Sequence, residues 1–129
     1  MKWWLLLSVL ALWPATSLAG AGSWSATVDG PRVAGVGRAY VSKALVPPGP
    51  IDAAHVVRVR WRYTAPSGPG LLAWLCTGNY CVRLHAHRGV TDAFAGTPGG
   101  AHWRFRFRLE TVDDGAINVG PVQLLVDYR

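Results

Sequence analysis

A strict alternation of apolar and charged residues is the feature that most constrains how this chain can fold. Between His102 and Glu110, every second position is apolar and the positions between carry ionisable side chains. Successive side chains of a β-strand point to opposite faces, so this spacing predicts a strand with one buried and one solvent-exposed face. The same pattern recurs in His55–Tyr63 and from Val122 to the C-terminus. We expect three strands of this half-buried kind.

Weaker strand signals and turn-forming residues fill much of the remaining sequence. The weaker signals lie at Ser23–Val28, Gly37–Leu45, Leu71–Cys76, Cys81–His85 and Val90–Phe94. Proline- and glycine-rich breakers stand between the segments, at Pro47–Pro50, Pro66–Gly70 and Pro98–Gly100. No stretch of ten or more residues has a helical period. The sequence therefore predicts an all-β fold, an antiparallel β-sandwich of about eight short strands.

The N-terminal segment has the three parts of a cleavable signal peptide. Lys2 gives a positive start, the run Trp3–Trp13 is apolar, and small residues follow up to Ala19. We predict a signal peptide at residues 1–19, with cleavage after Ala19 or, as the second choice, after Ala21. The apolar run is roughly half of the 20 residues that a spanning helix needs, so we expect no stable membrane anchor. Residues 20–129 then form a single domain.

Two cysteines, Cys76 and Cys81, stand in the predicted exported part. An even count in an exported chain favours a disulfide. The residues between them, Thr77–Tyr80, include Gly-Asn, which favours a tight turn, and apolar residues flank the pair. A metal or redox pair fits less well, because metal motifs usually use two such pairs and redox motifs space their cysteines more closely. We predict a disulfide across a β-hairpin, close to its turn.

Candidate catalytic and metal-binding residues are few. No serine stands in a Gly-x-Ser-x-Gly motif, and the one adjacent carboxylate pair, Asp113-Asp114, falls in a predicted turn. His85 and His87 are spaced to share a strand face, which is a spacing that zinc or copper can use, and His102 is a third candidate ligand. No acidic residue that could orient them is close in sequence. We expect a non-enzymatic protein with no catalytic residue, cofactor or metal.

Arginine ladders are the most suggestive surface feature. Two predicted strands carry three arginines each at alternate positions: Arg58, Arg60, Arg62, Arg104, Arg106 and Arg108. If both strands lay in one sheet and faced one way, the six guanidinium groups would form a basic, partner-binding face suited to carboxylates or phosphates. The alternative is that they form solvated outer faces whose long side chains cover the sheet. An exported domain rarely meets nucleic acid, so we expect no nucleic-acid partner.

A series of short motifs runs from the middle of the chain to its C-terminal residues. They are Trp61-Arg62-Tyr63, Gly70-Leu71, Leu75-Cys76 and Cys81-Val82-x-Leu84, then Gly89-x-Thr91-x-x-Phe94-Ala95, Pro98, Arg104-Phe105 and Gln123-x-x-Val126-x-Tyr128-Arg129. Together these motifs resemble those of the flagellar protein FlhE family. Their order and spacing carry the resemblance, which is firmest from Trp61 onward and weakest between Ala26 and Ala54. It implies a periplasmic β-sandwich with an accessory or regulatory role in flagellar assembly. The expected partners are proteins of the flagellar export apparatus or the rod, and the expected action is chaperone-like or limits proton leakage.

Two other functions remain open from the residues alone. One is a periplasmic glycan- or polyanion-binding module that uses the arginines together with Trp24, Trp61, Trp74 or Trp103. The other is an inhibitor of a cell-wall enzyme, which would insert the Pro47–Pro50 loop or the Thr77–Tyr80 turn into a cleft. The oligomeric state is open as well.

Overall fold

The structure, a computed structural model, describes residues 21–66, 70–110 and 115–129. The described residues form ten strands and no helix, so none of them belongs to a helix able to cross a membrane. The strands are β1 (Gly22–Val28), β2 (Arg32–Val33), β3 (Ala39–Val41), β4 (Val56–Tyr63), β5 (Leu71–Thr77), β6 (Tyr80–Leu84), β7 (Arg88–Thr91), β8 (Arg104–Leu109), β9 (Ile117–Asn118) and β10 (Val122–Tyr128). The predicted leader at 1–19 and the predicted turn at 113–114 lie outside the described residues.

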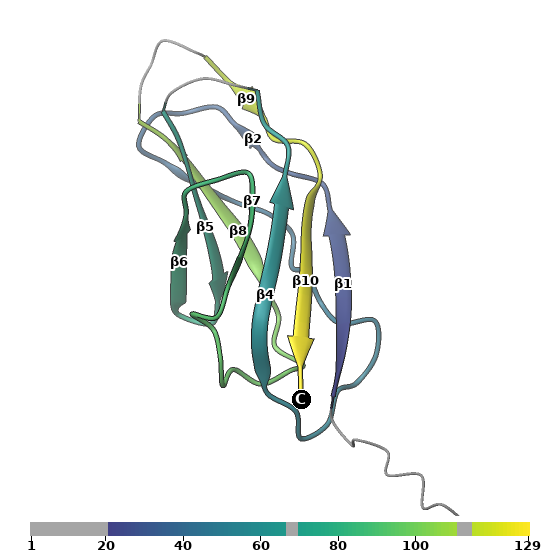
Figure 1. Ribbon diagram of the computed structural model, residues 1–129. Helices are drawn as coiled ribbons and strands as arrows, with labels where there is room; N and C mark the ends of the chain where they lie inside the picture. The colour runs from purple at the N-terminus through teal and green to yellow at the C-terminus, as the bar shows by residue number, and fades with distance from the viewer. Residues whose placement is uncertain (1–20, 67–69, 111–114) are drawn as a thin grey trace, which may run out of the picture.

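Two four-stranded antiparallel sheets form the layers of a sandwich (Figure 1). One sheet, in the order β1-β10-β4-β7, is called the β4 sheet below; the other, in the order β3-β8-β5-β6, is called the β8 sheet. The short pair β2-β9 lies at one end of the molecule. The prediction of an all-β, antiparallel sandwich is confirmed. The eight strands of the two sheets correspond to the predicted segments, and the two-residue strands β2 and β9 are additional.

The core lies between the two sheets and is filled by their alternating inward side chains. Phe105 and Phe107 of β8 are fully buried, as are Val122, Leu124 and Val126 of β10. The Tyr63 ring of β4 meets the two phenylalanine rings edge-on, with centroids 6.5 and 5.4 Å away, so aromatic contacts join the layers. Burial of each large apolar side chain in this way stabilises the folded state by roughly 1.5–3 kcal/mol. The alternation predicted for β8 and β10 is confirmed.

A β-bulge at the start of β4 changes which of its side chains point toward the core. Arg58 pairs with Asp127 and Val56 pairs with Tyr128, so Val57 has no partner on β10. An extra residue of this kind reverses the alternation beyond it. Val56 is therefore buried, whereas Val57 is half-buried at the surface. Strict alternation through His55–Tyr63 predicts Val57 on the inward face with Val59, and Val56 on the outward face. The bulge makes this part of the prediction wrong.

Two predicted strands are shorter or shifted in the structure. Only Ala39–Val41 of the predicted Gly37–Leu45 strand is continuous, and Leu45 pairs with Trp103 through an isolated bridge. β7 covers Arg88–Thr91, so Phe94 lies beyond the strand in a turn. Phe94 is still buried, because its ring packs edge-on against Trp103 with centroids 4.8 Å apart. The apolar residues of both segments pack in the core but do not extend the paired strands.

Candidate functional site

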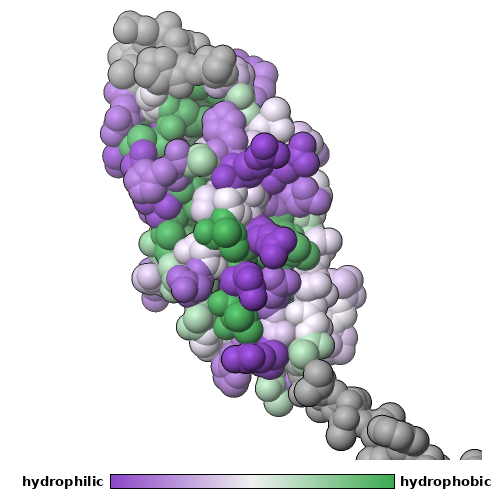
Figure 2. Space-filling model, viewed as in Figure 1, coloured by the Kyte–Doolittle hydropathy of each residue, from purple (hydrophilic) through white to green (hydrophobic). Residues whose placement is uncertain are grey.

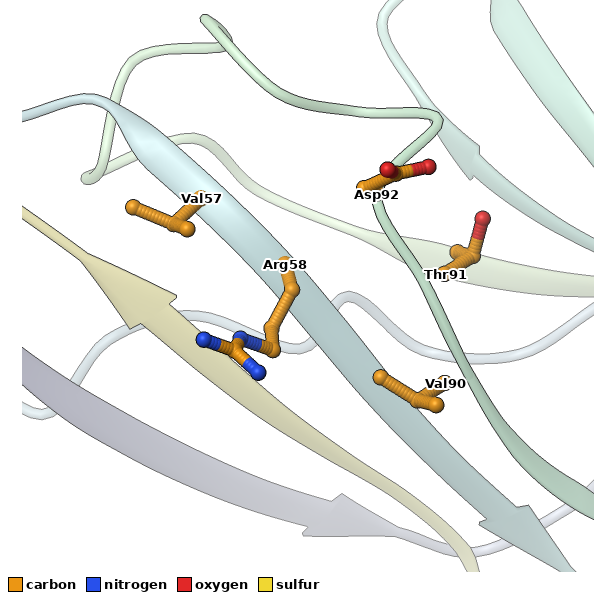
Figure 3. A pocket seen from close by; sticks show the side chains of 5 residues that line it. All are labelled: Val57, Arg58, Val90, Thr91 and Asp92. Carbon is orange, nitrogen blue, oxygen red and sulfur yellow. The ribbon is translucent and has the colours of Figure 1, made fainter.

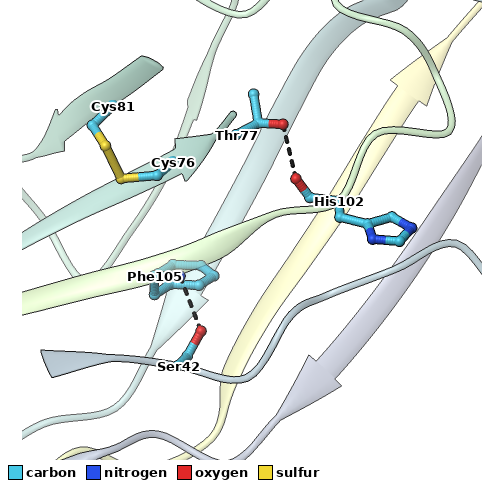
Figure 4. The surroundings of a disulfide bond; sticks show 6 residues. All are labelled: Ser42, Cys76, Thr77, Cys81, His102 and Phe105. Atoms are coloured by element: carbon cyan, nitrogen blue, oxygen red, sulfur yellow. Dashed lines mark hydrogen bonds between the residues drawn. A yellow bond between two sulfur atoms is a disulfide. The ribbon is translucent and has the colours of Figure 1, made fainter. Parts of the chain in front are cut away.

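The β5–β6 hairpin carries the disulfide. Cys76 and Cys81 are directly opposite in the register and are bonded, with their Cα atoms 4.1 Å apart, which confirms the predicted bridge (Figure 4). The turn between the strands has a positive φ of 56° at Gly78, a backbone conformation that favours glycine. The Thr77 hydroxyl donates a hydrogen bond of 2.8 Å to the carbonyl of His102, just before β8. The hairpin is thereby fixed to its neighbouring strand.

The outer face of the β8 sheet is built by the side chains that alternate with the core residues. β8 presents Arg104, Arg106 and Arg108 on this face, and Trp74 of β5 lies between Arg106 on one side and Arg83 of β6 on the other. Pairing across the hairpin sets this arrangement, since Cys76 opposite Cys81 places Trp74 opposite Arg83. The register of three strands therefore brings one aromatic ring into a row of arginines.

Three guanidinium groups surround the Trp74 ring. The Cζ atoms of Arg83, Arg106 and Arg108 lie 5.2, 5.8 and 5.6 Å from its centroid. These distances are within the roughly 6 Å range of cation–π attraction, which is worth about 0.5–1 kcal/mol for each exposed contact. Each of these contacts offsets part of the repulsion between the three like charges. We call Trp74, Arg83, Arg106 and Arg108 the arginine–tryptophan cluster.

The arginines of β8 also contact polar groups outside the cluster. The Arg108 Nη2 atom lies 4.0 Å from the Glu110 carboxylate, at the end of β8. Arg104 is held differently, since its Nη1 atom donates a hydrogen bond of 3.0 Å to the carbonyl of Ser42. The Ser42 hydroxyl accepts a hydrogen bond from the Phe105 amide (Figure 4). The same hydroxyl donates a hydrogen bond to the Lys43 carbonyl. The buried serine joins the chain beyond β3 to β8.

The other arginine ladder belongs to the opposite face of the molecule. Arg58, Arg60 and Arg62 point outward from β4, where the Nε atom of Arg58 lies 3.6 Å from the Asp127 carboxylate and Arg62 is opposite Arg88 of β7. Figure 2 shows hydrophilic and hydrophobic residues interleaved over the β4 side of this face, and paler residues over the β1 side. The six arginines therefore form two separate faces and not one, because β4 and β8 lie in different sheets.

A surface pocket of about 540 Å³ lies between β4 and β7 (Figure 3). Val57, the bulge residue, lines it together with Arg58, Val90, Thr91 and Asp92. In Figure 3 the Arg58 guanidinium turns toward β10, whereas the oxygens of Thr91 and Asp92 point the other way. A small-molecule site requires polar groups that converge on a ligand, and here they diverge.

His85 and His87 lie in the connection between β6 and β7 and not on a strand face, and His102 lies just before β8. The His87 ring lies 4.7 Å from the Tyr63 ring, and the His102 ring points away from the disulfide (Figure 4). In the part of the chain that the structure describes, no three His, Cys, Asp or Glu side chains gather in a way that could hold a metal ion. The sequence singled out Trp74 only as a candidate for glycan binding and did not single out Arg83, and it did not group either residue with the arginines of β8. The cysteine pair held the signal, since its register also places these two residues opposite each other.

These features define a disulfide-bonded antiparallel β-sandwich with basic outer faces. Residues 30–129 match the family model of the flagellar protein FlhE, and the chain belongs to this family. Its fold is also similar to that in a crystal structure of FlhE, with 30% sequence identity, 86% of this chain and 99% of that chain covered, and a TM-score of 0.77. A comparison with curated proteins gives no match.

Proposed function

We propose that this protein is exported to the periplasm and supports flagellar assembly by binding proteins of the flagellar export apparatus or its substrates. The observation that carries the proposal is the FlhE family match over residues 30–129, supported by the similarity to the FlhE crystal structure. The Cys76–Cys81 disulfide supports the compartment, because such bonds persist in the oxidising periplasm and are rare in the cytosol. The leader predicted at residues 1–19 supplies the route.

The action that we propose is contact and not catalysis. The Ser42 hydroxyl is used to join two segments, and the polar groups around the β4–β7 pocket diverge. By contrast, the outer faces of both sheets present arginines that can pair with a partner's acidic groups. Binding of this kind would let the protein act as a chaperone for exported subunits or limit proton leakage through the export apparatus.

Deletion of the gene in the flagellated bacterium that encodes it tests the role. We expect fewer correctly assembled flagella, slower swimming, and a larger fall in cytoplasmic pH when the cells are placed in acidic medium. The full chain should restore all three properties. A matched version that lacks the apolar run Trp3–Trp13 should restore none, because it would stay in the cytoplasm. Normal assembly, swimming and cytoplasmic pH in the deletion strain would contradict the proposal.

Fractionation with thiol labelling tests the compartment. We expect the protein in the periplasmic fraction, shortened by its leader, with Cys76 and Cys81 unreactive toward a maleimide until a reductant is added. Full-length protein in the cytosolic fraction with two reactive thiols would refute the proposed location.

A further inference from the structure

We propose that the arginine–tryptophan cluster on the outer face of the β8 sheet is a docking site for an extended, acidic segment of a partner protein. The inference rests on the proposed function, since it assumes that the protein acts by contact with other proteins. It adds the surface that makes the contact and the chemistry of the segment that is bound.

Charge is the first support. The cluster brings Arg83, Arg106 and Arg108 around one ring, and Arg104 extends the positive charge along β8. Among the described residues, the carboxylate within ion-pair distance of these arginines is that of Glu110, at 4.0 Å from Arg108. The positive charge of the face thus exceeds the negative charge that it carries, and a partner's carboxylates would balance it.

Ordering of the arginines is the second support. A free arginine loses side-chain entropy when it binds a carboxylate, and this loss weakens exposed ion pairs. Here the Trp74 ring already holds three guanidinium groups within 5.2–5.8 Å of its centroid. Guanidinium groups that are fixed before binding offer their paired N–H donors to a carboxylate at a smaller entropic cost. Among the described residues, guanidinium groups lie over a tryptophan ring only at Trp74, so the arginines of the β4 sheet have no such ring to order them.

Spacing is the third support, and it favours a polypeptide. Arginines at alternate positions of β8 repeat about every 6.8 Å, which is also the spacing of alternate side chains in an extended peptide. A sugar ring would require a bare aromatic face for stacking, but guanidinium groups lie over Trp74. A membrane would require protruding apolar side chains, and Val41, 48% exposed, is the large exposed apolar residue on the described part of this face. We therefore commit to an extended protein segment with acidic residues at alternate positions.

A binding experiment with a synthetic probe tests this site. The probe is a fluorescein-labelled peptide of alternating Glu and Thr, and its control has the same composition with the glutamates consecutive. Fluorescence anisotropy with the oxidised protein should show tighter binding of the alternating peptide. The variant R83Q/R106Q/R108Q should weaken that binding by about 10-fold, the loss of three modest ion pairs. The matched variant R60Q/R62Q/R88Q, which removes equal charge from the other face, should change it by less than about 2-fold.

A further variant separates charge from ordering. Trp74→Leu keeps every arginine and the net charge but removes the ring. We expect it to weaken binding of the alternating peptide by about 3-fold. Thermal unfolding of each variant checks that it is folded. Equal losses in the two arginine variants, or no preference between the peptides, would overturn the proposal. Tighter, cluster-dependent binding of heparin or of phosphatidylglycerol vesicles would overturn it too, and would assign the face to a glycan or a lipid.

Cells that carry the variants distinguish this inference from the function on which it rests. If R83Q/R106Q/R108Q fails to restore swimming to the deletion strain while R60Q/R62Q/R88Q succeeds, the docking site is supported. If both variants restore swimming fully, the docking site is refuted and the flagellar role stands. If the deletion itself has no effect, the proposed function fails whatever the peptides show.

Discussion

At the scale of single residues, two buried tryptophans differ in whether the indole N–H has a hydrogen-bond acceptor. The Trp24 indole donates a hydrogen bond of 3.0 Å to the Gly99 carbonyl. The Trp103 indole is fully buried, and its N–H finds no acceptor among the described residues. A buried donor without a partner costs about 1–3 kcal/mol. Trp103 therefore stabilises the core through its buried area, including the edge-on contact with the Phe94 ring 4.8 Å away, and not through its polar group.

Replacing each of these tryptophans by phenylalanine tests this difference. Trp24→Phe leaves the Gly99 carbonyl without its donor, whereas Trp103→Phe removes a donor that had no partner. We expect Trp24→Phe to lower the free energy of unfolding by about 1 kcal/mol more than Trp103→Phe does. Urea denaturation of the two variants measures the difference, and equal or reversed losses would refute the explanation.

Gly30 lies where two backbone segments approach closely. A Cβ atom at this position would clash with the backbone carbonyl oxygens of Gly120 and Val119. Gly49 is the matched control, because a Cβ atom there would meet nothing within 4 Å. We expect Gly30→Ala to destabilise the fold by about 1–3 kcal/mol and Gly49→Ala to change stability by less than about 0.5 kcal/mol. Thermal melts that show both changes as neutral would contradict the close approach.

Tyr63 makes the stability of the fold depend on pH in the alkaline range. Burial raises the pKa of Tyr63 above its ordinary value of 10.0, and the positive charge of Arg83 opposes this shift. A raised pKa means that the folded state favours the neutral phenol. Its contribution is complete below pH 10 and is lost as the pH rises through the folded-state pKa.

Denaturation between about pH 9 and 11.5 checks the sign of this effect. We expect Tyr63→Phe to lose less stability than the unaltered protein over this range, and the difference in slope cannot exceed about 1.4 kcal/mol per pH unit. A Tyr63→Phe slope identical to that of the unaltered protein would exclude this cause.

At the scale of elements, the sequence predicts a strand well when its own side chains decide the outcome. The alternation in β8 and β10 and the turn between Cys76 and Cys81 are all local patterns, and the structure confirms them. The bulge at Val57 depends on how β4 registers with β10, which no pattern within β4 reveals. β2 and β9 have two residues each, too few for any periodicity.

The disulfide restrains one hairpin, and the stabilisation that it contributes follows from the short loop that it closes. The bridge spans a sequence separation of 5. A loop this short constrains the unfolded chain only modestly, which corresponds to about 2 kcal/mol. We expect Cys76→Ser with Cys81→Ser to lower the free energy of unfolding by about this amount while the far-UV circular dichroism remains that of a β-protein. A double variant that is unfolded at 25 °C would show that the bridge supports more than its hairpin.

At the scale of the whole molecule, the placement of the arginines is what sequence reasoning could not supply. Alternation shows that Arg60 and Arg106 both point away from the core, but it does not assign their strands to sheets. The sheet orders place β4 and β8 in different layers, so the ladders face opposite ways. The resulting faces differ, because one groups its arginines around Trp74 and the other pairs Arg58 with Asp127.

Site-specific photo-crosslinking in living, flagellated cells tests the central claim that this protein acts by contact through the face of the β8 sheet. A photoreactive residue would replace Val41, exposed beside Arg106, and in a matched strain Ser25, exposed on the β4 sheet. Mass spectrometry should identify a flagellar export or rod protein, bonded through an acidic segment, in the adducts at position 41 and not at position 25. Adducts at neither position, or the same adducts at both, would contradict the account.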